Sequence, residues 1–199
     1  MKKMNVDMNA MKAEIGGAFV LSWMVFGMGL STLSGAVALA VVWMAFSGAH
    51  VLPVVTWSHM MTGDMGDTEG NWMPNGMRLL AQAVGALLAI ILVTEGKDAG
   101  WEATEMWIPD IADNLWSVVG MIAAGAVWWQ VHTRCNSAWA SAFGMMVLGG
   151  AMTLNGAHEM GASLASFGDG IADTLVNWIF DGLFVGLGAL IGVKIDEMV

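Results

Sequence analysis

Ionisable and polar side chains are rare in the apolar stretches of this 199-residue chain, and those present could exchange protons or hold backbone groups. Glu14 and Gln82 lie in such stretches, where a polar group must face the protein interior and find a partner. His158 and Glu159 are adjacent, and a histidine with an ordinary pKa of about 6.5 beside a carboxylate could form a pH-responsive pair. Alternatively, these two residues, like His50, form hydrogen bonds within a loop.

The sequence gives little support to other reactive chemistry. No segment groups a nucleophile, a base and an orienting side chain, so we expect no enzymatic activity. The single cysteine, Cys135, cannot form an internal disulfide and is far from any zinc-binding pattern. The 19 methionines could bind copper, but together with 11 tryptophans they are more typical of apolar packing and membrane interfaces. We therefore expect neither a cofactor nor a metal site.

The elements that position these residues are predicted to lie in a lipid bilayer. Hydrophobic residues make up 57% of the chain and charged residues 12%, too few to cover the surface of a soluble domain. The net charge of −10, with only seven Lys and Arg, argues against nucleic-acid binding. A helix needs about 20 apolar residues to cross a bilayer, so residues 1–199 fit a single membrane domain.

Six apolar stretches predict membrane-spanning helices. Residues 15–46 are too long for one crossing, so a turn is expected in the segment rich in Gly and Ser around 27–35. The polar segment 62–76 and the acidic segment 94–113 are expected outside the lipid. The predicted spans are residues 11–30, 32–48, 77–93, 114–131, 137–153 and 175–193.

Short apolar segments follow the second and the fifth predicted span, and each is too short to cross a bilayer. Within them, Gly48-Ala49-His50 and Gly156-Ala157-His158 recur at an offset of 108 residues. Three spans in each half place the two copies in opposite orientations. The sequence therefore predicts an inverted repeat of residues 11–93 and 114–193, joined by the acidic loop 94–113.

Positive charges predict the orientation of these spans. If the N-terminus is cytoplasmic, six of the seven Lys and Arg fall on the cytoplasmic side, and only Lys97 lies outside. We therefore expect a multi-pass protein of the cell (plasma) membrane with both termini in the cytoplasm.

Motifs spread from residue 13 to residue 187 are similar to those of a known family. Residues 47–56, Ser-Gly-Ala-His-Val-Leu-Pro-Val-Val-Thr, resemble the signature Ser-Gly-Ala-His-x-Asn-Pro-Ala-Val-Thr of the aquaporin (major intrinsic protein) family. Residues 13–17 and 81–86 resemble its first-helix and third-helix motifs, and 155–163 occupy the place of its second signature. The resemblance implies an all-α fold of six transmembrane helices and two re-entrant half-helices that begin near residues 53 and 161, assembled as a homotetramer.

The resemblance also implies a pore, whose midplane is apolar in this chain. Leu52-Pro53-Val54 and Met160-Gly161-Ala162 stand where the family has Asn-Pro-Ala, so both asparagines are replaced. Pro53 suits a helix start, and Gly161 permits a tight turn into the second half-helix.

Other family positions are carried over in the same way. The family's selectivity filter corresponds to Thr32, Leu148, Ala157 and Ser163, which provide neither an arginine nor an aromatic ring. The resemblance implies that Glu14 holds the backbone of the re-entrant loop. His50 and Gln82 are then expected to supply hydrogen bonds beside it.

These features predict passive conduction of small neutral molecules, such as water, glycerol-sized polyols or uncharged gases. An apolar midplane lacks the donors that replace lost hydration, so we expect a low water flux and a constriction that can close by dewetting. The alternative is a non-conducting membrane protein of the same fold with a structural or adhesion role, which the loss of both asparagines favours.

Overall fold

Every regular element in the described part of the chain is helical. The computed structural model describes residues 7–28, 33–94, 111–152, 156–166 and 170–198. This confirms the all-α class expected from the sequence. Its helices are α1 (Met8–Met28), α2 (Leu33–Ala45), α3 (Pro53–Thr62), the π-helical turn η1 (Thr68–Trp72), α4 (Met73–Thr94), α5 (Leu115–Cys135), α6 (Ala138–Met152), α7 (Ala157–Ser166) and α8 (Ile171–Asp196).

Two of these helical segments are long and apolar enough to cross a membrane. They are Thr68–Leu92 and Ile171–Asp196, judged by length and composition over the described residues. The apolar helices Leu33–Ala45 and Ala138–Met152 are shorter. Long apolar helices of this kind suggest membrane association.

The polar segment 62–76, which the sequence places outside the lipid, is partly helical. The Asp67 carboxylate accepts a hydrogen bond of 2.7 Å from the Gly70 N–H at the start of η1. The Asn71 side chain donates to the Met60 carbonyl at 2.8 Å and to the Asp64 carbonyl at 3.0 Å. These side chains satisfy local backbone groups, so a polar sequence can continue into α4 as a helix.

The helix α7 begins at Ala157, so the expectation of a start near residue 161 is wrong. Gly161 lies one turn inside α7, where a Cβ atom would come within 2.7 Å of the Ala86 carbonyl carbon and the Leu87 nitrogen of α4. Glycine is therefore needed at this position for close packing of α7 on α4, and not for a turn into the helix.

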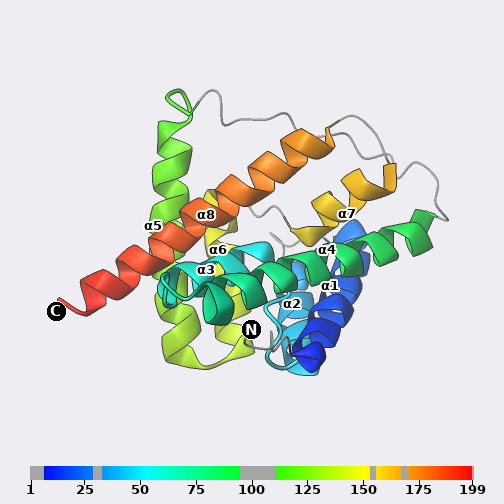
Figure 1. Cartoon of the computed structure of the whole chain (residues 1–199), viewed down its shortest axis with the longest axis horizontal. Helices are drawn as coiled ribbons and strands as arrows, with labels where there is room; N and C mark the ends of the chain where they lie inside the picture. Colours follow the sequence, from blue (N-terminus) through cyan, green and yellow to red (C-terminus); the bar gives the residue numbers. More distant parts are fainter. Residues whose placement is uncertain (1–6, 29–32, 95–110, 153–155, 167–169, 199) are drawn as a thin grey trace.

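The helices pack in two matched sets (Figure 1). The helix α1 packs on α4, and α5 packs on α8 in the same way. Each short helix lies against the last helix of the other set, α3 on α8 and α7 on α4, while α2 and α6 pack on each other. If α1, α2, α3 and α4 change places with α5, α6, α7 and α8, respectively, the same pairs of neighbouring helices result.

Two glycines make matching helix crossings. A Cβ atom at Gly85 of α4 would collide with the carbonyl oxygen of Ile15 and would reach the Phe19 nitrogen of α1. A Cβ atom at Gly188 of α8 would collide with the carbonyl oxygen of Ile122 and would reach a nitrogen one turn further along α5. The absence of a side chain lets both pairs of backbones approach closely.

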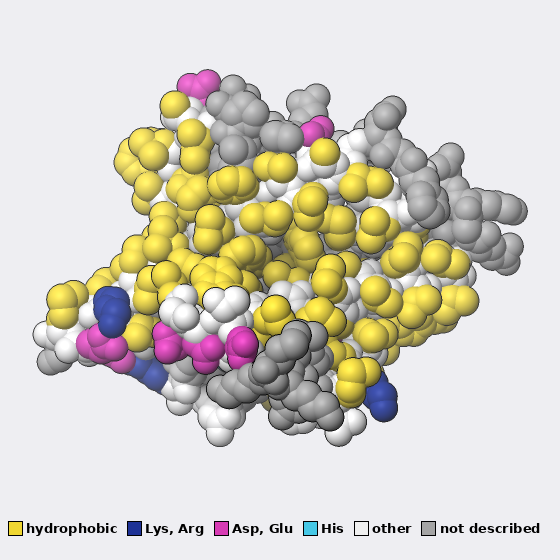
Figure 2. All heavy atoms as spheres, in the orientation of Figure 1, with side chains coloured by type: hydrophobic (Ala, Val, Ile, Leu, Met, Phe, Trp, Pro, Cys, Tyr) yellow, Lys and Arg dark blue, Asp and Glu magenta, His cyan; other side chains and the backbone are white. Residues whose placement is uncertain are grey.

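Hydrophobic side chains cover most of the face of the molecule that Figure 2 shows. On α4, the exposed residues Leu80, Val84, Leu88 and Ile91 follow helical spacing, whereas Gln82 faces inward and is fully buried. The exposed large hydrophobic residues of α2 follow the same spacing. A helix on the surface of a soluble protein shows the reverse arrangement, with polar residues outside.

Candidate functional site

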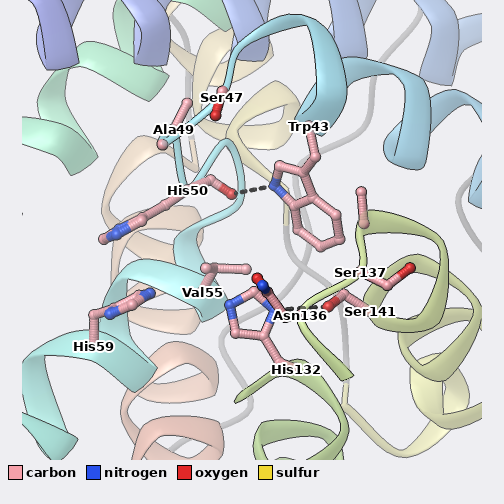
Figure 3. Close-up of a pocket in the computed structure, with 12 residues that line it drawn as sticks. Trp43, Ser47, Ala49, His50, Val55, His59, His132, Asn136, Ser137 and Ser141 are labelled. Carbon is pink, nitrogen blue, oxygen red and sulfur yellow. Dashed lines mark hydrogen bonds between the residues drawn. The ribbon is translucent and has the colours of Figure 1, made fainter. Parts of the chain in front are cut away.

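A cavity of about 380 Å³ lies where the loop before α3 meets α3, the end of α5 and the start of α6 (Figure 3). We call it the histidine cavity, because three of the four histidines of the chain line it. None of its lining residues is an Asp, Glu, Lys or Arg. They are Trp43, Ser47, Gly48, Ala49, His50, Val55, His59, His132, Asn136, Ser137, Ala138 and Ser141.

Two imidazole rings form a stack on one side of the histidine cavity. The rings of His50 and His59 are 4.1 Å apart between centroids and nearly parallel, at 3°. The edge of His59 meets Trp129 of α5 at a centroid distance of 4.9 Å. His59 lies two turns into α3, so the direction of this half-length helix sets where its ring reaches the cavity.

His132 lies in the last turn of α5, and its ring meets that of His59 edge to face at a centroid distance of 6.1 Å. Its ring stacks on Trp128 at 4.8 Å, and its Nδ1 is 2.8 Å from the Ser141 hydroxyl. The chain turns from α5 into α6 at Asn136, which adopts the left-handed conformation with φ of 43° that asparagine tolerates. This tight turn brings Ser141 of α6 next to His132.

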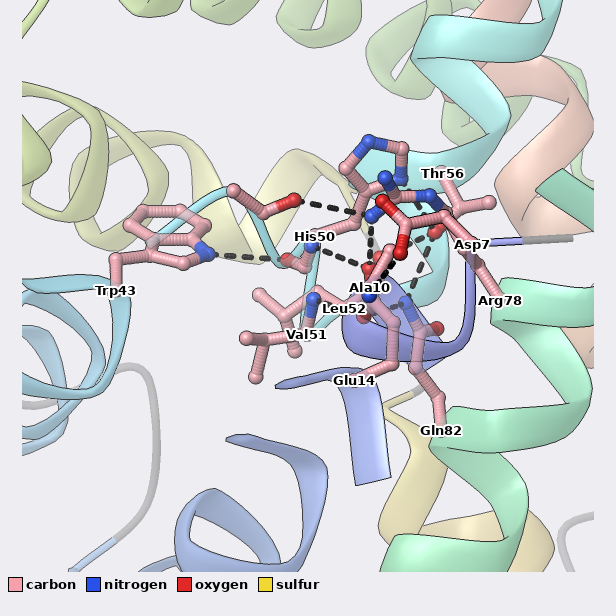
Figure 4. A network of polar contacts seen from close by, with 11 residues as sticks. Asp7, Ala10, Glu14, Trp43, His50, Val51, Leu52, Thr56, Arg78 and Gln82 are labelled. Carbon is pink, nitrogen blue, oxygen red and sulfur yellow. Dashed lines mark hydrogen bonds and ion pairs between the residues drawn. The ribbon is translucent and has the colours of Figure 1, made fainter. Parts of the chain in front are cut away.

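The carboxylate of Glu14 on α1 holds the loop before α3, residues 47–52 (Figure 4). Glu14 is fully buried. Its Oε1 accepts hydrogen bonds from the His50 N–H at 2.7 Å and from Arg78 at 2.5 Å. Its Oε2 accepts from the Val51 N–H at 2.8 Å and from Gln82 at 2.9 Å. All four partners are donors, so the site is built for an ionised carboxylate.

Further contacts fix the same loop from other helices. Arg78 of α4 donates to the Gly48 carbonyl at 3.0 Å, and the Trp43 indole of α2 donates to the His50 carbonyl at 3.0 Å. Val51 has a φ of 66°, which is unusual for a β-branched residue. A conformation of this kind persists only where surrounding contacts hold it, as they do here.

Thr56 connects the loop to α4. Its hydroxyl accepts a hydrogen bond of 2.9 Å from the Gln82 amide and lies 3.1 Å from the Nδ1 of His50. The structure thus brings together Glu14, His50 and Gln82, three residues singled out in the sequence. It adds Arg78 and Thr56, which sequence reasoning missed. Arg78 and Gln82 are four residues apart, so both lie on one face of a helix. This spacing would have indicated Arg78 as a partner of the same site.

Comparisons with protein-family models, curated proteins and solved structures find no match to this chain.

The two segments that stand where the aquaporin family has Asn-Pro-Ala differ in their settings. Leu52 directly precedes α3, Pro53 is its first residue, and Leu52 and Val54 are buried in the main core cluster. Met160-Gly161-Ala162 is buried within α7, where Met160 packs with Ala83 and Trp178 in a separate, smaller cluster. Leu52 and Met160 therefore belong to different hydrophobic clusters.

The four positions matched to the family's selectivity filter are not equally placed. Thr32 lies outside the described residues. Leu148 of α6 is partly buried against the main core, and Ala157 is buried at the start of α7. Ser163 is buried, and its hydroxyl donates to the Thr174 hydroxyl of α8 at 3.0 Å.

His158 and Glu159 lie side by side in the first turn of α7. Consecutive residues on a helix do not face each other, so the helix directs the two side chains differently. The His158 ring lies close to Gly156, where a Cβ atom would come within 2.5 Å of its Nδ1. Glu159 instead lies within electrostatic range of Asp181, which is buried on α8. A joint pH response of His158 and Glu159 stays a prediction.

Proposed function

We propose that this chain is an aquaporin-type membrane channel that conducts small neutral molecules passively. The observation that carries this proposal is the placement of the two short helices. The first turn of α3 is fully buried, that of α7 buries Ala157 and Met160, and each short helix lies against the last helix of the other half. Discontinuous helices in the interior of an inverted repeat are where membrane transporters of this design form their solute site.

The apolar outer surface supports the proposal that the six longer helices lie in a bilayer. Apolar residues at helical spacing cover the exposed sides of α2 and α4. The buried polar network around Glu14 faces inward, as a membrane protein requires of an ionisable group. The same apolar faces suit contacts between copies in the homotetramer that we propose.

The charges support one orientation. Lys12 and Arg78 lie in the first two turns of α1 and α4, while Arg134 and Lys194 lie in the last turns of α5 and α8. Arg78 contacts Gly48, which lines the same cavity as Asn136 at the end of α5. Arg78 also pairs with Glu14 of α1, and Arg134 pairs with Asp196 of α8, so these four helix ends lie near one another. We propose that these ends, with the histidine cavity, face the cytoplasm.

One observation favours a second candidate, a non-conducting protein with a structural or adhesion role. Leu52 is only 2% exposed and lies in the main core cluster with Val54 and Val55. A side chain packed this tightly beside the start of α3 leaves little room for a hydrated solute.

Osmotic swelling decides between the two candidates. Purified full-length protein is reconstituted into liposomes, and volume changes after gradients of sucrose, glycerol or urea are followed by light scattering. A channel raises the permeability to at least one of water, glycerol and urea above that of protein-free liposomes. Equal permeability to all three would contradict conduction and favour the structural role.

A further inference from the structure

We propose that the histidine cavity is the recognition site for the conducted solute, a small neutral molecule with both hydrogen-bond donors and acceptors, and that His59 is the residue that selects it. This inference rests on the proposed function. It assigns selectivity to the α3–α5–α6 junction and not to the positions that the family resemblance indicates, Thr32, Leu148, Ala157 and Ser163.

The first step is the availability of the His59 ring. His50 has its Nδ1 close to Thr56, and His132 has its Nδ1 close to Ser141. His59 is held by ring contacts with His50 and Trp129, and the described residues give its ring nitrogens no hydrogen-bond partner. The His59 side chain is half-buried and lines the cavity, so its ring is open to a solute there.

The second step is the chemistry that an accessible imidazole offers. A neutral imidazole has one N–H donor and one acceptor nitrogen, so it can exchange two hydrogen bonds with a hydroxyl or an amide. The stack on His50 and the edge contact with Trp129 fix the plane of the His59 ring. A fixed donor and acceptor distinguish solutes by the position of their polar groups.

The third step is the rest of the lining. Asn136 and Ser137 add an amide and a hydroxyl, while the Trp43 ring and Val55 add apolar surface. A solute with polar groups on one side and C–H groups on the other fits this combination. A cation would find no carboxylate in the lining, and the volume of about 380 Å³ lies within the range of small-molecule sites.

The test compares His59→Phe and His59→Gln in proteoliposomes of the full-length protein. Phenylalanine keeps a ring that can stack on His50 and contact Trp129, but it removes both nitrogens. We expect the ratio of glycerol to water permeability to fall by about three- to tenfold for each hydrogen bond that glycerol loses. Glutamine keeps a donor and an acceptor, so we expect His59→Gln to stay within about twofold of the original ratio. An unchanged ratio in His59→Phe would overturn the assignment.

A second readout does not depend on conduction. Diethyl pyrocarbonate modifies accessible neutral imidazoles, and mass spectrometry locates the modified histidine. We expect His59 to react, and glycerol to slow its reaction. A rate at His59 that glycerol does not change would overturn the inference. If the liposomes with unmodified protein are no more permeable than protein-free ones, the proposed conduction fails, and this protection measurement alone decides whether the cavity binds the solute.

Discussion

Replacing Glu14 by glutamine tests whether the buried carboxylate holds the loop before α3. Glutamine has nearly the same size, but one of its two polar atoms is an NH₂ group that cannot accept a hydrogen bond. Each carboxylate oxygen of Glu14 now accepts two hydrogen bonds, one from a loop N–H and one from a side chain of α4. Whichever way the glutamine amide turns, two buried donors lose their acceptor and face another donor.

The size of the effect follows from these two lost contacts. A buried donor without a partner costs about 1–3 kcal/mol, so two such donors cost about 2–6 kcal/mol. The ion pair with Arg78 is also lost. Because the Arg78 side chain is 19% exposed, water compensates part of that loss. We therefore expect Glu14→Gln to lower the free energy of unfolding by about 3–5 kcal/mol.

The assay is reversible unfolding in mixed micelles with increasing denaturing detergent, followed by tryptophan fluorescence. Glu69→Gln is the matched control, because Glu69 is exposed on η1 and the change removes the same charge. We expect this control to stay within about 0.5 kcal/mol of the unmodified protein. If Glu14→Gln changed the free energy of unfolding as little as its control does, the carboxylate would not be holding the loop.

A double variant separates the network from a general loss of packing. Arg78→Gln removes the cation that pairs with Glu14. If the two residues act together, the variant carrying both changes should be about 1–3 kcal/mol more stable than the sum of the single effects predicts. Additive effects would show that Glu14 and Arg78 stabilise the fold independently.

Three further predictions concern packing, environment and orientation. Gly188→Ala should lower the free energy of unfolding by about 1–3 kcal/mol in the same assay, because the added Cβ collides with the α5 backbone. Gly150→Ala should leave it unchanged or raise it slightly, because a Cβ at Gly150 meets open space. In bilayers Leu88→Lys should lower the free energy of unfolding by about 2.5–3.5 kcal/mol. Met65 is about as exposed but lies in the polar turn, so Met65→Lys should lower it by less than about 0.5 kcal/mol. Equal effects of the two variants would argue against a lipid-facing α4. An impermeant maleimide should label the exposed Cys135 in inside-out vesicles only, and labelling of intact cells would reverse the orientation.

The longer helices could be predicted because a continuous apolar stretch gives a strong signal. The spans expected at 77–93 and 114–131 correspond to α4 and α5, which extend a few residues further. The start of α7 could not be predicted in this way. Gly161 is a helix breaker in isolation, but the close packing of α7 on α4 fixes the glycine inside the helix.

The candidate site was harder to predict because its parts are distant in the sequence. Glu14 and Arg78 are 64 residues apart, so only the packing of α1 on α4 brings them together. The histidine cavity joins His59 of α3 with His132 of α5. Neither histidine lies in a recognisable motif, and local sequence patterns do not indicate which distant residues contact each other in the fold.

The matched helix crossings show where the two halves differ in chemistry. Aligning the crossing of Gly85 with that of Gly188 makes Met121 the counterpart of Glu14, and Val185 the counterpart of Gln82. Both counterparts are apolar and belong to the main core cluster. The first half therefore positions its short helix with buried hydrogen bonds, and the second half has apolar packing at the same places. The two short helices also begin differently: the Glu14 carboxylate holds the His50 and Val51 N–H groups of the loop before α3, whereas α7 extends back to Ala157.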